Sequence, residues 1–149
     1  MIIRRYLPTD CKEIITLFYN TVHSVNAKDY TKKQLDVWAT GKENLNDWNK
    51  SLLNHYTLVA TIAGVIVGFG DIDKSGYLNR LFVHKDYQQK GIGSVLCNEL
   101  EKISPNKITV HASITAKPFF LKRNYTMIKK QEVIRQNISL TNFFMEKSL

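Results

Sequence analysis

The chain has 149 residues, of which 44% are hydrophobic and 23% charged, and it carries a formal net charge of +8. This length and composition predict one globular domain, residues 1–149, with a single well-buried core. No apolar run approaches the roughly 20 residues of a membrane-spanning helix, so we expect no membrane partner.

The positive charge has two interpretations, a solvated surface or a field that favours a polyanionic cofactor or an acidic partner. Lysines and arginines are spread through the chain without a dense basic stripe, which argues against a nucleic-acid partner. Cys11 and Cys97 are isolated, so they predict neither a metal site nor a disulfide framework. The first residues lack the apolar region and cleavage site of a signal peptide, and we expect a cytoplasmic protein.

The N-terminal part is predicted to begin with a strand at residues 2–6, ended by Pro8. A helix is expected from Asp10, whose carboxylate would cap it while Glu13 completes a capping box. Apolar residues recur on one face of this helix, which is typical of a helix packed on a core.

A second, shorter helix is predicted after Thr31, with Gln34 at the capping-box position. Another helix is expected within residues 44–54. Tyr30, Trp38 and Trp48 lie within residues 30–54, and they either line a pocket or fill the core, since large aromatic residues do both.

Two β-branched runs, residues 56–62 and 65–72, predict a hairpin at Ala63-Gly64. A strand at residues 77–83 is followed by a glycine loop and by a helix that we expect to stop at Ser104-Pro105-Asn106. The remaining predicted elements are a strand at 108–111, a short helix within 115–123, a left-handed exit at Asn124, and a hairpin of 125–135 and 138–145.

The glycine loop after the 77–83 strand reads Gln88-Gln89-Lys90-Gly91-Ile92-Gly93-Ser94. Its glycines let the backbone turn N–H groups inward, and the following helix adds unpaired amides and the positive end of its dipole. This combination predicts a phosphate site. The spacing fits neither a dinucleotide fingerprint, because residue 96 is Leu, nor a P-loop, because no Lys follows Gly93.

The pattern Q-x-x-G-x-G between this strand and this helix resembles the acetyl-CoA loop of the GNAT superfamily of N-acetyltransferases. The order of predicted elements resembles that family over nearly the whole chain. Residues 116–125 are also similar to the family's A-x-x-x-Y-x-x-x-G-F ending, with Phe120 and Asn124 as substitutions. The resemblance implies an α+β fold of three layers, α/β/α, around a central, mostly antiparallel and splayed sheet.

The resemblance implies acetyl-CoA as cosubstrate and no metal. The pyrophosphate of CoA would lie on backbone amides of the loop, and the pantetheine arm would add to the 77–83 strand as a neighbouring strand would. The thioester would lie where that strand separates from 108–111, with a strand amide polarising its carbonyl. The expected cofactor-binding residues are Leu81, Phe82, Val83, Gln89, Lys90, Gly91, Ile92, Gly93 and Ser94.

The implied reaction is direct attack of a primary amine on the thioester in a ternary complex. An alkyl amine with a pKa of about 10 is almost entirely protonated at pH 7, so a base should be near. Tyr77 occupies the position of the carboxylate that some family members use, and it is a poor base. Asn79 cannot accept a proton, and Asp71 and Asp73 would act only through water. His111 has the best-suited pKa, but a structural histidine explains that residue equally well.

The family's usual acid position holds Phe120, which cannot donate a proton. Ser113, or Ile114 in another alignment, occupies the place of an asparagine that binds the CoA arm, and the serine hydroxyl or solvent could protonate the thiolate. Tyr30 and Trp38 are expected to bind a small-molecule amine. A peptide amine and a CoA-binding module without turnover stay open as alternatives, and we expect a monomer or homodimer.

Overall fold

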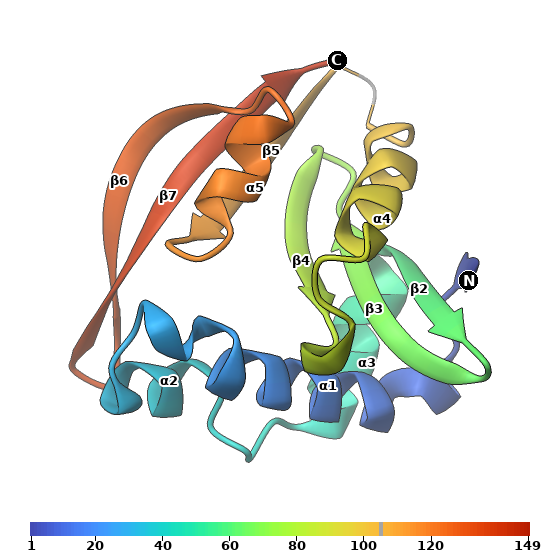
Figure 1. Cartoon of the computed structure of the whole chain (residues 1–149), viewed down its shortest axis with the longest axis horizontal. Helices are drawn as coiled ribbons and strands as arrows, with labels where there is room; N and C mark the ends of the chain where they lie inside the picture. The colour runs from blue at the N-terminus through green and yellow to red at the C-terminus, as the bar shows by residue number, and fades with distance from the viewer. Residues whose placement is uncertain (105) are drawn as a thin grey trace.

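The computed structural model describes residues 1–104 and 106–149, and its elements are labelled in Figure 1. Pro105, expected to help end a helix, lies outside the described residues. The strands are β1 Ile2–Arg5, β2 Tyr56–Ile62, β3 Val65–Ile72, β4 Tyr77–Val83, β5 Lys107–Ser113, β6 Thr126–Arg135 and β7 Ile138–Ser148. The α-helices are α1 Cys11–Ser24, α2 Lys32–Trp38, α3 Leu45–Asn54, α4 Ile92–Glu101 and α5 Lys117–Lys122. Three short 3₁₀ turns are η1 Pro8–Asp10, η2 Asn26–Lys28 and η3 Lys85–Tyr87.

In the described part of the chain, seven strands form a sheet in the order β1-β2-β3-β4-β5-β7-β6. Every neighbouring pair is antiparallel except β4 and β5. These two strands pair at Tyr77 with Thr109 and at Leu78 with Val110, and then they separate (Figure 1). The predicted splayed and mostly antiparallel sheet is confirmed.

Helices cover both faces of the sheet (Figure 1). The core under α1, α2 and α3 includes the fully buried Ile14 and Phe69. The core under α4 and α5 includes Leu96, Leu100 and Ile108. The predicted three-layer arrangement is therefore confirmed. Among the helices described, none is both long and apolar enough to cross a bilayer.

Helix α4 lies close to β3 because that strand has glycine where a side chain would face the helix. A Cβ on Gly70 would lie 2.9 Å from Leu100 Cδ1 and 3.0 Å from the carbonyl oxygen of Arg80. Real Cβ atoms rarely approach other atoms so closely, so the close packing of helix on strand depends on this glycine. The packing places the N-terminus of α4 beside the end of β4.

Strand β4 contains an irregularity at Asn79. Asp71 of β3 pairs with Arg80, but its neighbour Ile72 pairs with Leu78, so Asn79 is left without a partner in the register. One extra residue in a strand changes which side chains face which side of the sheet. Strict alternation would have put Arg80 on the face opposite to Tyr77.

The two predicted helix caps have different outcomes. Thr31 accepts a hydrogen bond from the Gln34 N–H, and the Gln34 side chain accepts one from Thr31, so this capping box is confirmed. The capping box at Asp10 is wrong. The Asp10 carboxylate pairs with Arg4 at 2.8 Å, and Glu13 accepts from the backbone of β3. Both carboxylates thus bind groups outside α1 instead of capping it.

The predicted turns are confirmed by their backbone angles. At the β2–β3 tip, Ala63 has φ +51° and Gly64 has φ +79°, and at the β6–β7 tip Gln136 and Asn137 have φ +47° and +65°. Two consecutive left-handed residues match the right-handed twist of paired strands. Asn124 has φ +70°, as expected for the exit from α5.

Candidate active site

The glycine loop ends at the N-terminus of α4, where Gly91 is the N-cap residue with φ +79°. The first hydrogen bond of the helix runs from Val95 N–H to the Gly91 carbonyl at 3.1 Å, so the three N–H groups between them have no partner inside the helix. A Cβ on Gly91 would meet no atom within 4 Å, so the space beside it is open. The loop therefore presents unpaired N–H groups at the positive end of a helix, which suits a phosphate.

Gln88, the first residue of the loop motif, connects the loop to the end of β4. Its Nε2 donates to the Val83 carbonyl at 2.8 Å, and Thr21 Oγ1 of α1 donates to the same oxygen at 3.0 Å. These two bonds hold the loop at a defined place against the strand. They also occupy the Val83 carbonyl.

The separation of β5 leaves part of the backbone of β4 unpaired. His84 N–H donates to the Val67 carbonyl, so Phe82, two residues earlier, also directs its polar backbone groups to β3. By the same alternation, Leu81 and Val83 direct theirs to the open edge. Because the Val83 carbonyl is occupied, the backbone groups of these two residues that have no partner among the described residues are the N–H and carbonyl of Leu81 and the N–H of Val83.

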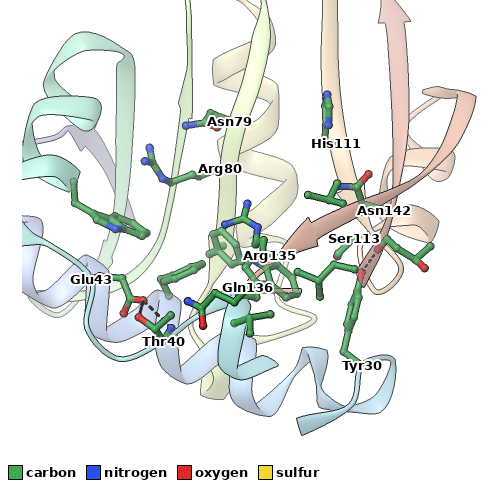
Figure 2. Close-up of a pocket in the computed structure, with 18 of the residues that line it drawn as sticks. Tyr30, Thr40, Glu43, Asn79, Arg80, His111, Ser113, Arg135, Gln136 and Asn142 are labelled. Carbon is green, nitrogen blue, oxygen red and sulfur yellow. Dashed lines mark hydrogen bonds between the residues drawn. The ribbon is translucent and has the colours of Figure 1, made fainter. Parts of the chain in front are cut away.

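A cavity of ≈ 830 Å³ lies beside this edge, and Figure 2 shows residues that line it. Its walls come from α1, α2, α3 and β4 on one side and from β5 and the β6–β7 hairpin on the other. The residues predicted to act on the acceptor or in the chemistry all line this cavity, namely Tyr30, Trp38, Tyr77, His111 and Ser113. Residues distant in sequence are thus brought together.

Tyr30 lines the cavity with its ring. Its hydroxyl is engaged in hydrogen bonds within the protein. The hydroxyl donates to the Thr141 carbonyl at 2.7 Å and accepts from Ile114 N–H at 2.9 Å. Its ring centroid lies 5.3 Å from that of the half-buried Trp38. Together the two rings form an apolar surface against which an acceptor can pack.

His111 and Tyr77 lie ring to ring in a T-shaped arrangement, with centroids 5.3 Å apart. Partial burial lowers the pKa of His111 from its ordinary value of 6.5, so its imidazole is neutral at pH 7. Gln131 Nε2 donates to His111 Nδ1 at 3.1 Å, which leaves the imidazole proton on Nε2. Burial raises the pKa of Tyr77, so this phenol keeps its proton and can donate.

Ser113 and Phe120 differ in their relation to the cavity. Ser113 Oγ accepts from Ala116 N–H at 3.0 Å, which leaves the hydroxyl hydrogen available for donation into the cavity it lines. Phe120 is buried in the core, with its ring centroid 4.9 Å from that of Tyr125. No hydroxyl is therefore present at the position of the tyrosine in the sequence pattern.

Arg80 lines the cavity and was missed by the sequence analysis. Its Nη1 donates to Asp71 at 2.8 Å, its Nη2 donates to Ser51 Oγ at 3.0 Å, and its guanidinium lies 4.6 Å from the centroid of the Trp48 ring. Only the irregularity at Asn79 turns Arg80 to this face. Strict alternation of side chains along the strand predicts that Arg80 lies on the opposite face, so no sequence pattern indicated its place in the cavity.

Asp71 and Asp73, considered as bases acting through water, have structural contacts. Asp71 is fully buried and also accepts a hydrogen bond from His55 Nδ1 at 2.7 Å, which raises the pKa of His55. Asp73 Oδ1 accepts from the backbone N–H groups of Ser75 and Tyr77 and shapes the β3–β4 turn. Both carboxylates hold elements in place.

Two further features concern metals and thiols. Across residues 1–104 and 106–149, no group of three or more His, Cys, Asp or Glu side chains is placed to hold a metal ion. Cys11 and Cys97 are buried and free.

The geometry agrees with comparisons to known proteins. Residues 26–149 match the family described as acetyltransferase (GNAT) domain. This chain belongs to the GNAT acetyltransferase family. It is similar to the uncharacterized N-acetyltransferase YafP of Escherichia coli strain K12, with 35% identity over 144 residues that cover 96% of this chain and 93% of the relative.

Solved structures agree with the family. A GCN5-related N-acetyltransferase from Rhodopseudomonas palustris superposes with a TM-score of 0.95 and 32% identity, covering 99% of this chain and 95% of the other. The PaiA N-acetyltransferase of Thermoplasma acidophilum, solved with coenzyme A, has a TM-score of 0.80 and 18% identity over 99% and 98% of the two chains, and shares the fold. This GNAT protein is thus an enzyme that transfers an acetyl group from acetyl-CoA.

Proposed function

We propose that this GNAT enzyme acetylates a primary amine of a small molecule, which attacks the thioester directly in a ternary complex. The observation that carries the proposal is a cavity lined by aromatic and polar side chains from both halves of the chain, beside the free edge of β4. A concave cavity lined by aromatic side chains suits a small ligand, whereas an extended peptide binds along a groove or a sheet edge.

The proposed cofactor site consists of the loop and the edge of β4. The unpaired N–H groups at the start of α4, the left-handed Gly91 and the open space beside it support binding of the CoA pyrophosphate. The free backbone groups of Leu81 and Val83 support strand-like pairing with the pantetheine arm. Phe82, which lies between them, contributes its ring to the wall of the adjacent cavity. The proposed loop residues are Gln89, Lys90, Gly91, Ile92, Gly93 and Ser94.

The proposed proton transfers use three side chains of the cavity. When bound, acetyl-CoA supplies the electrophilic thioester carbon. We assign His111 as the acceptor of the amine proton, which requires Nδ1 to exchange its hydrogen bond from Gln131 for one from the amine or a water. Ser113 and Tyr77 both hold a hydroxyl proton at neutral pH, and they are the proposed donors to the leaving thiolate.

A calorimetric titration with acetyl-CoA, followed by a panel of small amines while free thiol is measured, tests the proposal. We expect binding, and thiol release with one class of amine. Binding without release for any small amine would contradict the proposal and favour a peptide acceptor or a CoA-binding module. Cytoplasmic location and a monomeric or homodimeric state stay predictions from the sequence.

The loop is tested by Gly91→Val and Gly93→Val. Both substitutions should abolish measurable acetyl-CoA binding, because the branched side chains would occupy the phosphate path. Gly64→Val is the matched control for Gly91→Val, since both glycines have φ +79° and no atom within 4 Å of a built Cβ, but Gly64 lies at the β2–β3 tip. Equal losses of binding in Gly64→Val and Gly91→Val would show that backbone strain alone is responsible.

A further inference from the structure

The acceptor cavity carries charges that the proposed proton transfers do not use. Arg80 and Arg135 are the two cations that line it, and Glu43 is the carboxylate among the described lining residues. Both Glu43 oxygens are occupied. Oε2 accepts from the N–H and hydroxyl of Thr40 at 2.8 and 2.9 Å, and Oε1 accepts from Gly41 N–H at 3.2 Å.

Arg135 is the last residue of β6, and Figure 2 shows its side chain among the residues that line the cavity. Within the described residues it makes no ion pair with any carboxylate, whereas other cations near the sheet do. Its charge opposes the effect of burial on the pKa of Tyr77, as the charge of Arg80 does. Both guanidinium groups therefore act on the same part of the cavity.

Arg80 is held in place by its neighbours. Asp71, Ser51 and the Trp48 ring fix its guanidinium, and 17% of its side chain is exposed. Asp71 is shared with His55, so one buried carboxylate faces two basic side chains. With His55 protonated, this group of three carries a positive charge, to which Arg135 adds another.

We infer that the cavity selects an acceptor amine that also bears an anionic group, a carboxylate or a phosphate, bound by Arg135, while the charge of Arg80 acts on the same part of the cavity. A guanidinium binds either anion through two parallel hydrogen bonds. The apolar part of such an acceptor packs on Trp38 and Trp48, while an amine without an anionic group leaves the Arg135 guanidinium without a counter-charge among the described residues. The inference rests on the proposed function, since it names the acceptor class of that site.

The test compares matched amines in binding and in turnover. Phenylalanine, phenylalaninamide and phenethylamine differ at the carboxylate, and phosphoethanolamine against ethanolamine isolates the phosphate. Binding in the presence of CoA is followed by tryptophan fluorescence, because both tryptophans of the chain, Trp38 and Trp48, line the cavity. We expect the anionic member of at least one set to bind and react roughly 10-fold to 100-fold better than its neutral-tail partner.

Arg135→Gln should remove most of this preference and leave acetyl-CoA affinity unchanged. Arg135→Glu should reverse it in favour of phenethylamine. Lys130→Gln is the matched control, because it removes the same charge from an exposed position of β6 that does not line the cavity. It should leave the preference as in the unmodified enzyme.

The outcomes separate this inference from the proposed function. Selective binding of an anionic amine without thiol release would keep the inference and contradict the small-molecule acetylation. Equal kcat/KM values for the anionic and the neutral member of every matched set would overturn the inference while the proposed function stands. An equal effect of Arg135→Gln and Lys130→Gln on the preference for anionic amines would do the same. Absence of binding by every anionic amine would also overturn it.

Discussion

His111 is the cavity side chain whose charge changes closest to neutral pH. Burial lowers its pKa, and the hydrogen bond from Gln131 is compatible only with an unprotonated Nδ1. Both effects favour neutral imidazole, the form that can accept a proton. The sequence analysis selected this residue because of the ordinary pKa of an imidazole. Its contact with Gln131 arises only in the folded sheet, where β7 pairs with β5, which carries His111, and with β6, which carries Gln131.

We expect the acidic limb of the pH profile of kcat/KM to lie below 6.5. The lowered pKa keeps His111 unprotonated further into the acid range, and protonation below that pKa removes the proton acceptor. His111→Asn should lower kcat/KM roughly 10²-fold at pH 7 and abolish this limb. A steady-state pH series for both proteins measures it, and an unchanged limb in His111→Asn would exclude His111 as the base.

At the scale of elements, α4 and β3 form the support of the cofactor loop. Gly70 allows the close contact of the helix with the strand, and the irregularity at Asn79 turns Arg80 into the cavity. Hydrophobic periodicity was enough to predict every strand and helix of this region. It could not predict the irregularity, because a shift in strand register depends on the partner strand.

Gly70→Ala should lower the free energy of unfolding by about 1–3 kcal/mol, because the added methyl group overpacks the interface between β3 and α4. A denaturant titration measures the change. The double variant Gly70→Ala/Leu100→Ala serves as control, since Leu100 Cδ1 is the closest atom to the built Cβ. Its loss of stability should be smaller than the sum of the two single losses, and strict additivity would contradict the predicted clash.

At the scale of the whole molecule, the two halves of the sheet are joined at β4 and β5 through two residue pairs. The segment before α2 crosses from one half to the other and strengthens this junction. Tyr30 bonds to Thr141 and Ile114, and Asp29 accepts from Thr115 Oγ1 at 2.7 Å. The cavity is thus held between halves that the N-terminal helices connect.

Tyr30→Phe should lower the free energy of unfolding by about 1–3 kcal/mol, because it leaves the Ile114 N–H and the Thr141 carbonyl without their partner. Hydrogen exchange at the Ile114 amide should become faster. Tyr19→Phe is the matched control, since Tyr19 is exposed and its hydroxyl makes no hydrogen bond within the described residues. Equal effects of the two substitutions would show that Tyr30 does not join the halves.

The amino-acid sequence by itself determined the order of elements, the tips of the hairpins, the glycine loop and, through them, the family. These features depend on local chemistry: apolar periodicity, left-handed glycines and asparagines, and unpaired amides at a helix start. Tertiary structure alone decided that Asp10 pairs with Arg4 instead of capping α1, and that Arg80 faces the cavity. Arg4 lies only six residues from Asp10, but both contacts depend on how strands and helices pack and on strand register, which no local pattern encodes.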